Sequence, residues 1–180
     1  GILAEPIKHD LGLSDTQLGL MSGAAFALFY TFLGIPIARL ADRGSRTWIM
    51  TGALAIWSGF TALCGQAQSF LQLFVARVGV GVGEAGGVAP AFSLISDYFP
   101  PRQRARALAV FSFGVPIGSG LGTLLGGLVA SAVDWRVAFL SVGVGGLLFA
   151  PLFRLTVREP VRGALDARAE HLVARGPAGA

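Results

Sequence analysis

Charged residues are scarce in this 180-residue chain. Asp, Glu, Lys and Arg together account for 13% of the residues, whereas 53% are apolar. A soluble domain usually carries about twice that share of charge, so the composition argues against a soluble protein. Cys64 is the single cysteine, which rules out an internal disulfide bond. It lies in an apolar run, where we expect a small packing residue.

Several kinds of binding site have no support in the sequence. The net charge of +4 does not indicate a nucleic-acid partner, because the arginines form short clusters between long uncharged runs. His9 and His171 are isolated, so neither a metal site nor a hydrolytic triad is expected. Residues 81–86 match the glycine pattern of dinucleotide-binding loops, but this match lies in an apolar run without the strand that such loops need. We therefore expect no cofactor.

Long uncharged runs dominate the chain instead. A helix needs about 20 residues to cross the hydrocarbon core of a bilayer, and five stretches reach or approach that length. They are Thr16–Ala38, Thr47–Leu63, Phe70–Ser96, Ala107–Val133 and Val137–Phe153. The alternation of a membrane β-strand is absent, so helices are the remaining way to span the bilayer. The sequence therefore predicts an all-α, polytopic transmembrane bundle.

The distribution of arginine predicts how this bundle lies in the membrane. Three arginines fall in residues 39–46, three in 102–106 and three in 154–162, whereas the alternate loops hold few basic residues. By the positive-inside rule the arginine-rich segments are cytoplasmic. At the opposite end of the first run, Ser14 and Gln17 have the spacing of a helix capping box. The polar residues from 161 to 180 are expected to begin a cytoplasmic linker.

Arg77 and Glu84 interrupt the third run and are the strongest candidates for a functional site. A charge within a membrane span costs about 2.5–3.5 kcal/mol on insertion scales. The two residues are seven apart, so they share one side of a helix, with Gly81 between them. Two interpretations remain open: structural polar contacts inside the bundle, or a site that couples an ion to a substrate.

Two further groups are candidates for roles in gating and packing. Asp42, Arg43 and Arg46 form a charged turn that is either a topology signal or a cytoplasmic gate, and Asp97 could pair with one of these arginines. Glycine also recurs every fourth residue, a pattern that lets helices approach closely, for static packing or for sliding. The glycines of the fourth run are Gly114, Gly118, Gly122 and Gly126.

Two segments resemble signatures of the major facilitator superfamily. Residues 38–46 resemble its loop signature between the second and third helices, although Ala38 and Ser45 stand where glycine is usual. Residues 73–81 resemble its fourth-helix signature, including the intramembrane Arg77. A narrower resemblance is to Spinster-like carriers. It rests on residues 79–85, 89–90, 103–106, 116–122, 134–136 and 157–160, in the expected order.

This resemblance implies an architecture and an activity. It implies the N-terminal six-helix half of a twelve-helix carrier, lacking most of helix 1. Residues 1–15 would hold the end of helix 1 and an external loop, 16–160 helices 2 to 6, and 161–180 the start of the central linker. The expected partners are the lipid bilayer, a small or lipid-like solute and the missing C-terminal bundle, in a bacterial inner membrane.

The implied function is secondary active transport by alternating access, with a proton as the expected coupling ion. A non-transporting membrane receptor or scaffold on the same bundle is the alternative. A membrane enzyme is disfavoured, because the sequence offers no catalytic set of residues at a bilayer surface. The resemblance carries a gating role to Asp42, Arg43 and Arg46, and leaves the substrate undetermined.

Overall fold

The computed structural model describes residues 2–166, apart from the side chains of residues 22, 24–26 and 28. Every regular element in this part of the chain is helical. In chain order the elements are α1 (Ala4–Leu11), α2 (Asp15–Gly19), the π-helical turn η1 (Leu20–Ala24), α3 (Ala25–Arg43), α4 (Arg46–Cys64), α5 (Phe70–Ala85), α6 (Val88–Tyr98), α7 (Pro101–Ala132) and α8 (Trp135–Thr156). The predicted all-α fold is confirmed, and residues 167–180 of the predicted linker lie outside the described part.

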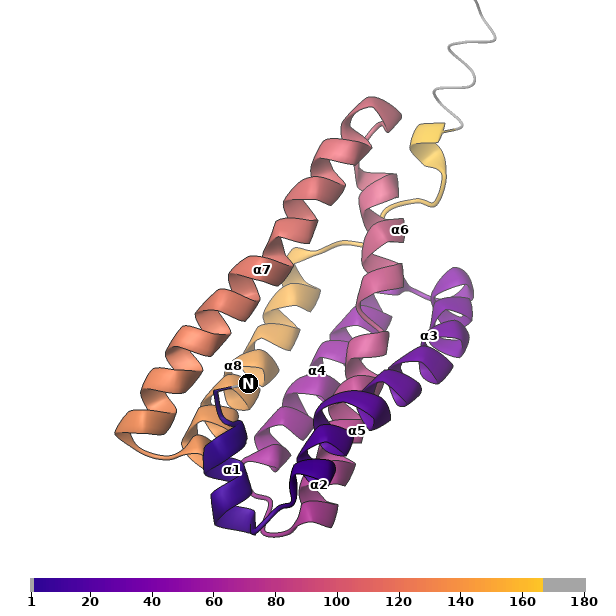
Figure 1. Ribbon diagram of the computed structural model, residues 1–180. Helices are drawn as coiled ribbons and strands as arrows, with labels where there is room; N and C mark the ends of the chain where they lie inside the picture. The colour runs from indigo at the N-terminus through magenta and orange to yellow at the C-terminus, as the bar shows by residue number, and fades with distance from the viewer. Residues whose placement is uncertain (1, 167–180) are drawn as a thin grey trace, which may run out of the picture.

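Four helical segments are long and apolar enough to cross a membrane. They are Arg46–Cys64, Phe70–Tyr98, Pro101–Ala132 and Trp135–Thr156. The remaining predicted run, Thr16–Ala38, lies within α2, η1 and α3, which follow one another without a gap. Figure 1 shows the long helices side by side in one elongated bundle, with α1 and α2 at the end opposite the α6–α7 turn.

Helix starts follow local capping chemistry. The predicted capping box at α2 is present: the Ser14 hydroxyl accepts from the Gln17 N–H at 3.2 Å, and the Gln17 side chain accepts from the Ser14 N–H at 2.9 Å. Ser45, Ser69 and Asp134 cap α4, α5 and α8 in the same manner, each accepting from a backbone N–H. These polar residues therefore set the ends of the apolar runs.

The third predicted span is interrupted in the structure. Residues 70–96 were expected to form one run, but a turn at Gly86 and Gly87 separates α5 from α6. Pro90 has no N–H to bond the carbonyl of Gly86, four residues earlier, so a regular α-helix cannot continue through this point. Glu84 consequently lies one residue from the end of α5, directly before the interruption. Interrupted helices of this kind are common in transporters.

Close helix packing is centred on α4. A Cβ added to Gly83 of α5 would lie 2.5 Å from the Trp57 backbone nitrogen, and one added to Gly79 would overlap the Phe60 ring. On the other side, Gly143 and Gly146 of α8 meet Ala62 and Ser58 of α4 in the same way. These close approaches are the small-residue contacts that membrane helices use. Glycine here determines how α5 and α8 fit against α4.

The glycines of α7 behave differently from the packing expected of them. A Cβ added to Gly114, Gly118, Gly122 or Gly126 would meet no described heavy atom within 4 Å. The close approach to α7 falls instead on Gly127, where an added Cβ would lie 2.9 Å from the Ile2 side chain. Gly126 is nevertheless buried, so a packing role for this glycine face stays a prediction. Sequence periodicity identifies a smooth face but not the element that covers it.

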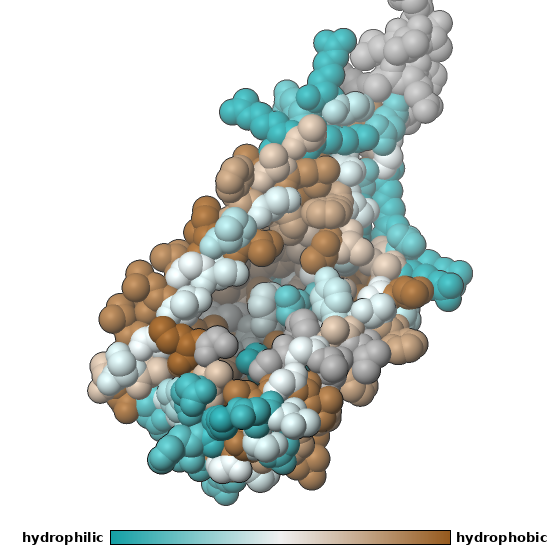
Figure 2. All heavy atoms as spheres, in the orientation of Figure 1, coloured by the Kyte–Doolittle hydropathy of each residue, from teal (hydrophilic) through white to brown (hydrophobic). Residues whose placement is uncertain are grey.

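The loops sort to the two ends of the bundle as the arginine pattern requires. Figure 2 shows hydrophilic side chains at both ends and mainly hydrophobic ones between them. The apolar core nearest the end that carries α1 includes Ile7, Met21, Leu73 and Trp135. Cys64 belongs to this core and is fully buried, in agreement with a packing role.

Candidate functional site

A cavity of about 610 Å³ lies beside Arg77, inside the bundle. Side chains of α1, α2, η1, α5, α7 and α8 contribute to its wall. Most of the lining is apolar, and the exceptions are Arg77 of α5 with Ser119 and Thr123 of α7. Gly122, one of the glycines predicted to pack helices, also faces this space. The cavity therefore presents one cation and two hydroxyls in apolar surroundings.

Arg77 lines this cavity and forms no salt bridge with an acidic residue of the described chain. Its guanidinium carbon lies 5.5 Å from the centroid of the Phe139 ring, a cation–π distance. Its Nε atom is buried and has no hydrogen-bond acceptor among the described residues. Buried polar groups are almost always hydrogen-bonded. An unmatched donor at the edge of a cavity is thus available to an acceptor that enters it.

Glu84 lies on the same helix as Arg77, about two turns further along α5. The side chains of both residues are partly buried. The two charges are near enough to interact electrostatically, but they form no salt bridge within the described chain. Gly81 lies between them and is buried. The structure keeps this carboxylate and this guanidinium on one helix as separate charges.

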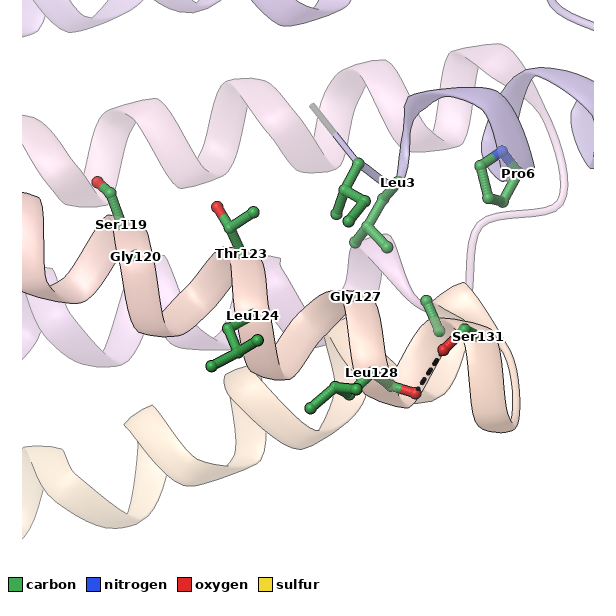
Figure 3. Close-up of a pocket in the computed structure, with 11 residues that line it drawn as sticks. Leu3, Pro6, Ser119, Gly120, Thr123, Leu124, Gly127, Leu128 and Ser131 are labelled. Carbon is green, nitrogen blue, oxygen red and sulfur yellow. Dashed lines mark hydrogen bonds between the residues drawn. The ribbon is translucent and has the colours of Figure 1, made fainter.

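A second cavity, of about 830 Å³, adjoins the first along α7 (Figure 3). Ser119 and Thr123, one helical turn apart, point to the same side of α7 and line both cavities. Leu3 and Pro6 of the α1 region lie on the facing wall. Neither Ser119 nor Thr123 was among the residues predicted from the sequence. The sequence feature that could have identified them was their spacing of four residues on a helix with an open glycine face.

A network of charges joins the helices at the arginine-rich end. Arg46 is 1% exposed and forms salt bridges with two carboxylates, Asp97 of α6 and Glu159 after α8. Its Nε donates to Glu159 at 2.7 Å, and its Nη1 also donates to the Ser93 hydroxyl at 2.9 Å. Arg46 is therefore the arginine with which Asp97 pairs.

Glu159 was not among the predicted site residues, yet it is central to this network. Besides Arg46, it accepts from the Thr47 N–H at 2.9 Å, the Ser45 hydroxyl at 2.9 Å and the Thr47 hydroxyl at 3.0 Å. Partial burial by itself would raise the pKa of Glu159, but these hydrogen bonds outweigh it and lower the pKa from 4.5 to about 2. Only its position in a family-like motif after the last span could have drawn attention to it.

The segment after α8 binds to the ends of α3 and α6 at the same end of the bundle. The Arg162 guanidinium donates to the carbonyls of Ala41, Asp42 and Gly44 at the end of α3, where a cation suits the helix dipole. The Gly163 N–H donates to Asp97 at 2.9 Å. By contrast, the Asp42 and Arg43 side chains are exposed and form no salt bridge with described residues. Of the four predicted gate residues, the structure brings together Arg46 and Asp97.

A separate polar contact fastens α1 at the opposite end. Asp10 accepts from the indole N–H of Trp135 at 3.2 Å and forms a salt bridge with Arg136. Arg136 also donates to the Ala67 carbonyl at 2.9 Å. These bonds tie α1, the α4–α5 loop and the start of α8 together. These bonds fix the position of α1, which lines the cavity beside Arg77.

Comparison with known proteins agrees with this architecture. The family model of the Major Facilitator Superfamily matches residues 1–178. An "MFS-type efflux pump" of Mycolicibacterium smegmatis is 43% identical over 156 residues, which cover 87% of this chain and 36% of that protein. "Protein spinster" of Drosophila melanogaster is 34% identical, over 91% of this chain and 27% of that protein. A "Hexuronate transporter" of Bacillus subtilis is 31% identical, over 88% and 37% respectively.

A solved structure shows the same fold. A bacterial homolog of the human lysosomal transporter Spinster, in an inward-facing and unoccupied conformation, superposes with a TM-score of 0.81 at 41% identity. The match covers 90% of this chain and 39% of that one. The chain thus spans about a third of the length of the relatives it matches, and these relatives are named as transporters rather than enzymes. It is a partial half of a Spinster-like transporter fold, and it belongs to the major facilitator superfamily.

Proposed function

We propose that the full-length protein containing this chain is a secondary carrier whose solute passes beside Arg77. The observation that carries this proposal is the cavity beside Arg77, whose wall holds two hydroxyls and an arginine with a buried Nε that has no acceptor among residues 2–166. Burying such a cation costs free energy unless a counter-charge compensates for it. An anionic group on the solute can supply that charge. A receptor or scaffold would have no need for an unmatched cation in a cavity.

The proposed solute is an amphipathic organic anion. Its anionic group would bind Arg77, since a guanidinium offers paired donors to carboxylate or phosphate, while Ser119 and Thr123 offer additional hydrogen bonds. The rest of the wall, which includes Leu18, Met21 and Phe139, is apolar and suits a hydrophobic part. The names of the relatives include a hexuronate transporter, so a small hydrophilic anion is the natural comparison.

Uptake by the full-length protein in liposomes tests the proposal. Radiolabelled lysophosphatidylglycerol and glucuronate serve as amphipathic and hydrophilic anion probes. We expect Arg77→Ala to reduce uptake of the preferred probe at least tenfold, with Arg77→Lys in between, because lysine keeps the charge but not the paired donors. Arg102→Gln, at an exposed arginine in the first turn of α7, is the control for charge loss. Uptake that is unchanged in Arg77→Ala would argue against the proposed route.

Proton coupling at Glu84 is the second part of the proposal. Glu84 supports it by position: a carboxylate at the end of an interrupted helix, on the same element as Arg77 but not bonded to it. Movement at the α5–α6 interruption would change how far Glu84, at the end of α5, is buried from water, and so its affinity for a proton. Addition of the preferred probe to the purified protein should therefore change proton binding, measured with a pH-sensitive dye. Glu84→Gln should show no such change.

The charge network around Arg46 is proposed to control the cytoplasmic opening. Asp42 and Arg43 are exposed beside it and are free to contact the second bundle of the full-length carrier. Asp42 and Arg43 would then act in the alternation between two packed states of the carrier, and they would not contact the solute directly. The expected site of action is the inner membrane of a bacterium, in line with the bacterial relatives.

A further inference from the structure

Arg154 and Trp48 form an isolated pair on the outside of the bundle. Arg154 lies in the last turn of α8, and its guanidinium carbon is 4.6 Å from the centroid of the Trp48 ring. Trp48 belongs to the first turn of α4 and is 60% exposed. Because the two helices pack along their lengths, the pair joins the two at the arginine-rich end. The guanidinium therefore lies over the face of the indole ring.

The donors of Arg154 are unused. Its Nε is buried without an acceptor, and no hydrogen bond or salt bridge of Arg154 is found among residues 2–166. Three carboxylates at this end of the bundle already have partners: Asp97 and Glu159 bind Arg46, and Asp166 binds Arg104. An arginine carries five N–H donors, so a guanidinium that lies over an indole and has no acceptor in the described chain is available to an external one.

The depth of this pair matches the membrane surface. The 22 residues of α8 extend about 33 Å, close to the thickness of a hydrocarbon core. Arg154 is two residues from the end of α8, so it lies at the level of the lipid headgroups. Leu152 and Leu155 beside it are 51% and 81% exposed, as expected for a surface that faces lipid chains. Tryptophan is itself enriched at this level.

We propose that Arg154 and Trp48 bind the phosphate of an anionic phospholipid in the cytoplasmic leaflet. The guanidinium would donate to the phosphate oxygens, the indole would hold the guanidinium and contact the glycerol region, and the exposed leucines would contact the acyl chains. The site is on the lipid-facing surface of α4 and α8, separate from the cavity beside Arg77. It depends on membrane insertion and not on the proposed transport activity.

Native mass spectrometry of the full-length protein with added phosphatidylglycerol tests the site. The neutral variant Arg154→Gln should weaken binding of one lipid about fivefold, which corresponds to roughly 1 kcal/mol for one arginine at a membrane surface. Arg154→Lys should lose less, and Trp48→Leu should also weaken binding because the stacking surface is removed. Arg102→Gln removes an equal charge from the same end and should leave this lipid bound as tightly as before.

Three results would overturn the proposal. One is equal weakening by Arg102→Gln, which would mean diffuse attraction to the basic end. Another is equal binding of phosphatidylcholine, which has the phosphate but no net charge. The third is displacement of the lipid by millimolar inorganic phosphate, which would make free phosphate the ligand. Should Arg154→Gln not fold, the Trp48→Leu and Arg154→Lys variants decide the matter, and unchanged binding in both would refute the site.

Discussion

Replacing Glu159 by glutamine should destabilise the protein by removing the carboxylate that neutralises Arg46. A pKa lowered from 4.5 to about 2 corresponds to about 3 kcal/mol at 1.36 kcal/mol per pKa unit. The Glu159 side chain is 30% exposed, so solvent screening reduces this amount, and Arg46 keeps Asp97 as a partner. We therefore expect a loss of about 1.5 kcal/mol at pH 7 in Glu159→Gln.

The pH dependence gives this prediction its sharpest test. Since the folded-state pKa of Glu159 lies below its ordinary value, its contribution is complete above pH 4.5 and disappears as the pH falls towards 2. Melting temperatures of the full-length protein in detergent should drop by about 3 °C in Glu159→Gln at pH 7. The difference from the unsubstituted protein should shrink as the pH is lowered through this window.

The matched control is Asp42→Asn, which removes an exposed carboxylate at the same end that has no salt bridge in the described chain. Its melting temperature at pH 7 should stay within about 1 °C of the original. Equal melting temperatures for Glu159→Gln and the unsubstituted protein, or a difference that is constant down to pH 3, would refute the reasoning from the hydrogen bonds of Glu159.

Three other predictions follow from the fold and the proposed gate. Gly83→Ala should destabilise the protein by about 1–3 kcal/mol, because the new Cβ would meet the α4 backbone. A Cβ added to Gly52 of α4 would meet no atom within 4 Å, so Gly52→Ala should be neutral or slightly stabilising in thermal unfolding. A cysteine in place of Gln103 should react with impermeant maleimide only from the cytoplasmic side, and one in place of Gln68 only from outside, since both positions are exposed. The reverse labelling pattern would contradict the predicted topology. Asp42→Asn should lower the maximal transport rate more than the apparent affinity, because a gate controls turnover; a weaker affinity at an unchanged rate would contradict the gate.

The sequence was sufficient for the overall architecture because membrane insertion imposes simple rules. Uncharged runs of about 20 residues must be helices, and the Ser14–Gln17 pattern was enough to place the start of α2. The interruption at Gly86 and Gly87 was hidden, because the length and polarity of an apolar run do not reveal a break within it. Pro90 and the two glycines, which cause the interruption, are visible in the sequence. They did not predict it, because prolines are often tolerated in membrane helices.

The candidate site was less predictable because it depends on contacts between distant segments. Arg77 and Glu84 stood out as charges in an apolar run, whereas Ser119 and Thr123 are uncharged and gain significance only because α7 faces the same cavity. Glu159 was missed for a similar reason, since 113 residues separate it from Arg46. Likewise, the spacing of the α7 glycines could not say which neighbour, if any, covers that face.

Gradient-driven uptake by the Glu84→Gln variant tests the central claim most directly. The full-length protein in liposomes would be given the preferred anion probe, with and without an imposed pH gradient. We expect that Glu84→Gln no longer concentrates the probe in response to the gradient but still exchanges labelled for unlabelled probe, because glutamine mimics a permanently protonated carboxyl. Concentrative uptake that still follows the gradient in this variant would contradict coupling at Glu84 and leave Glu84 with a structural role.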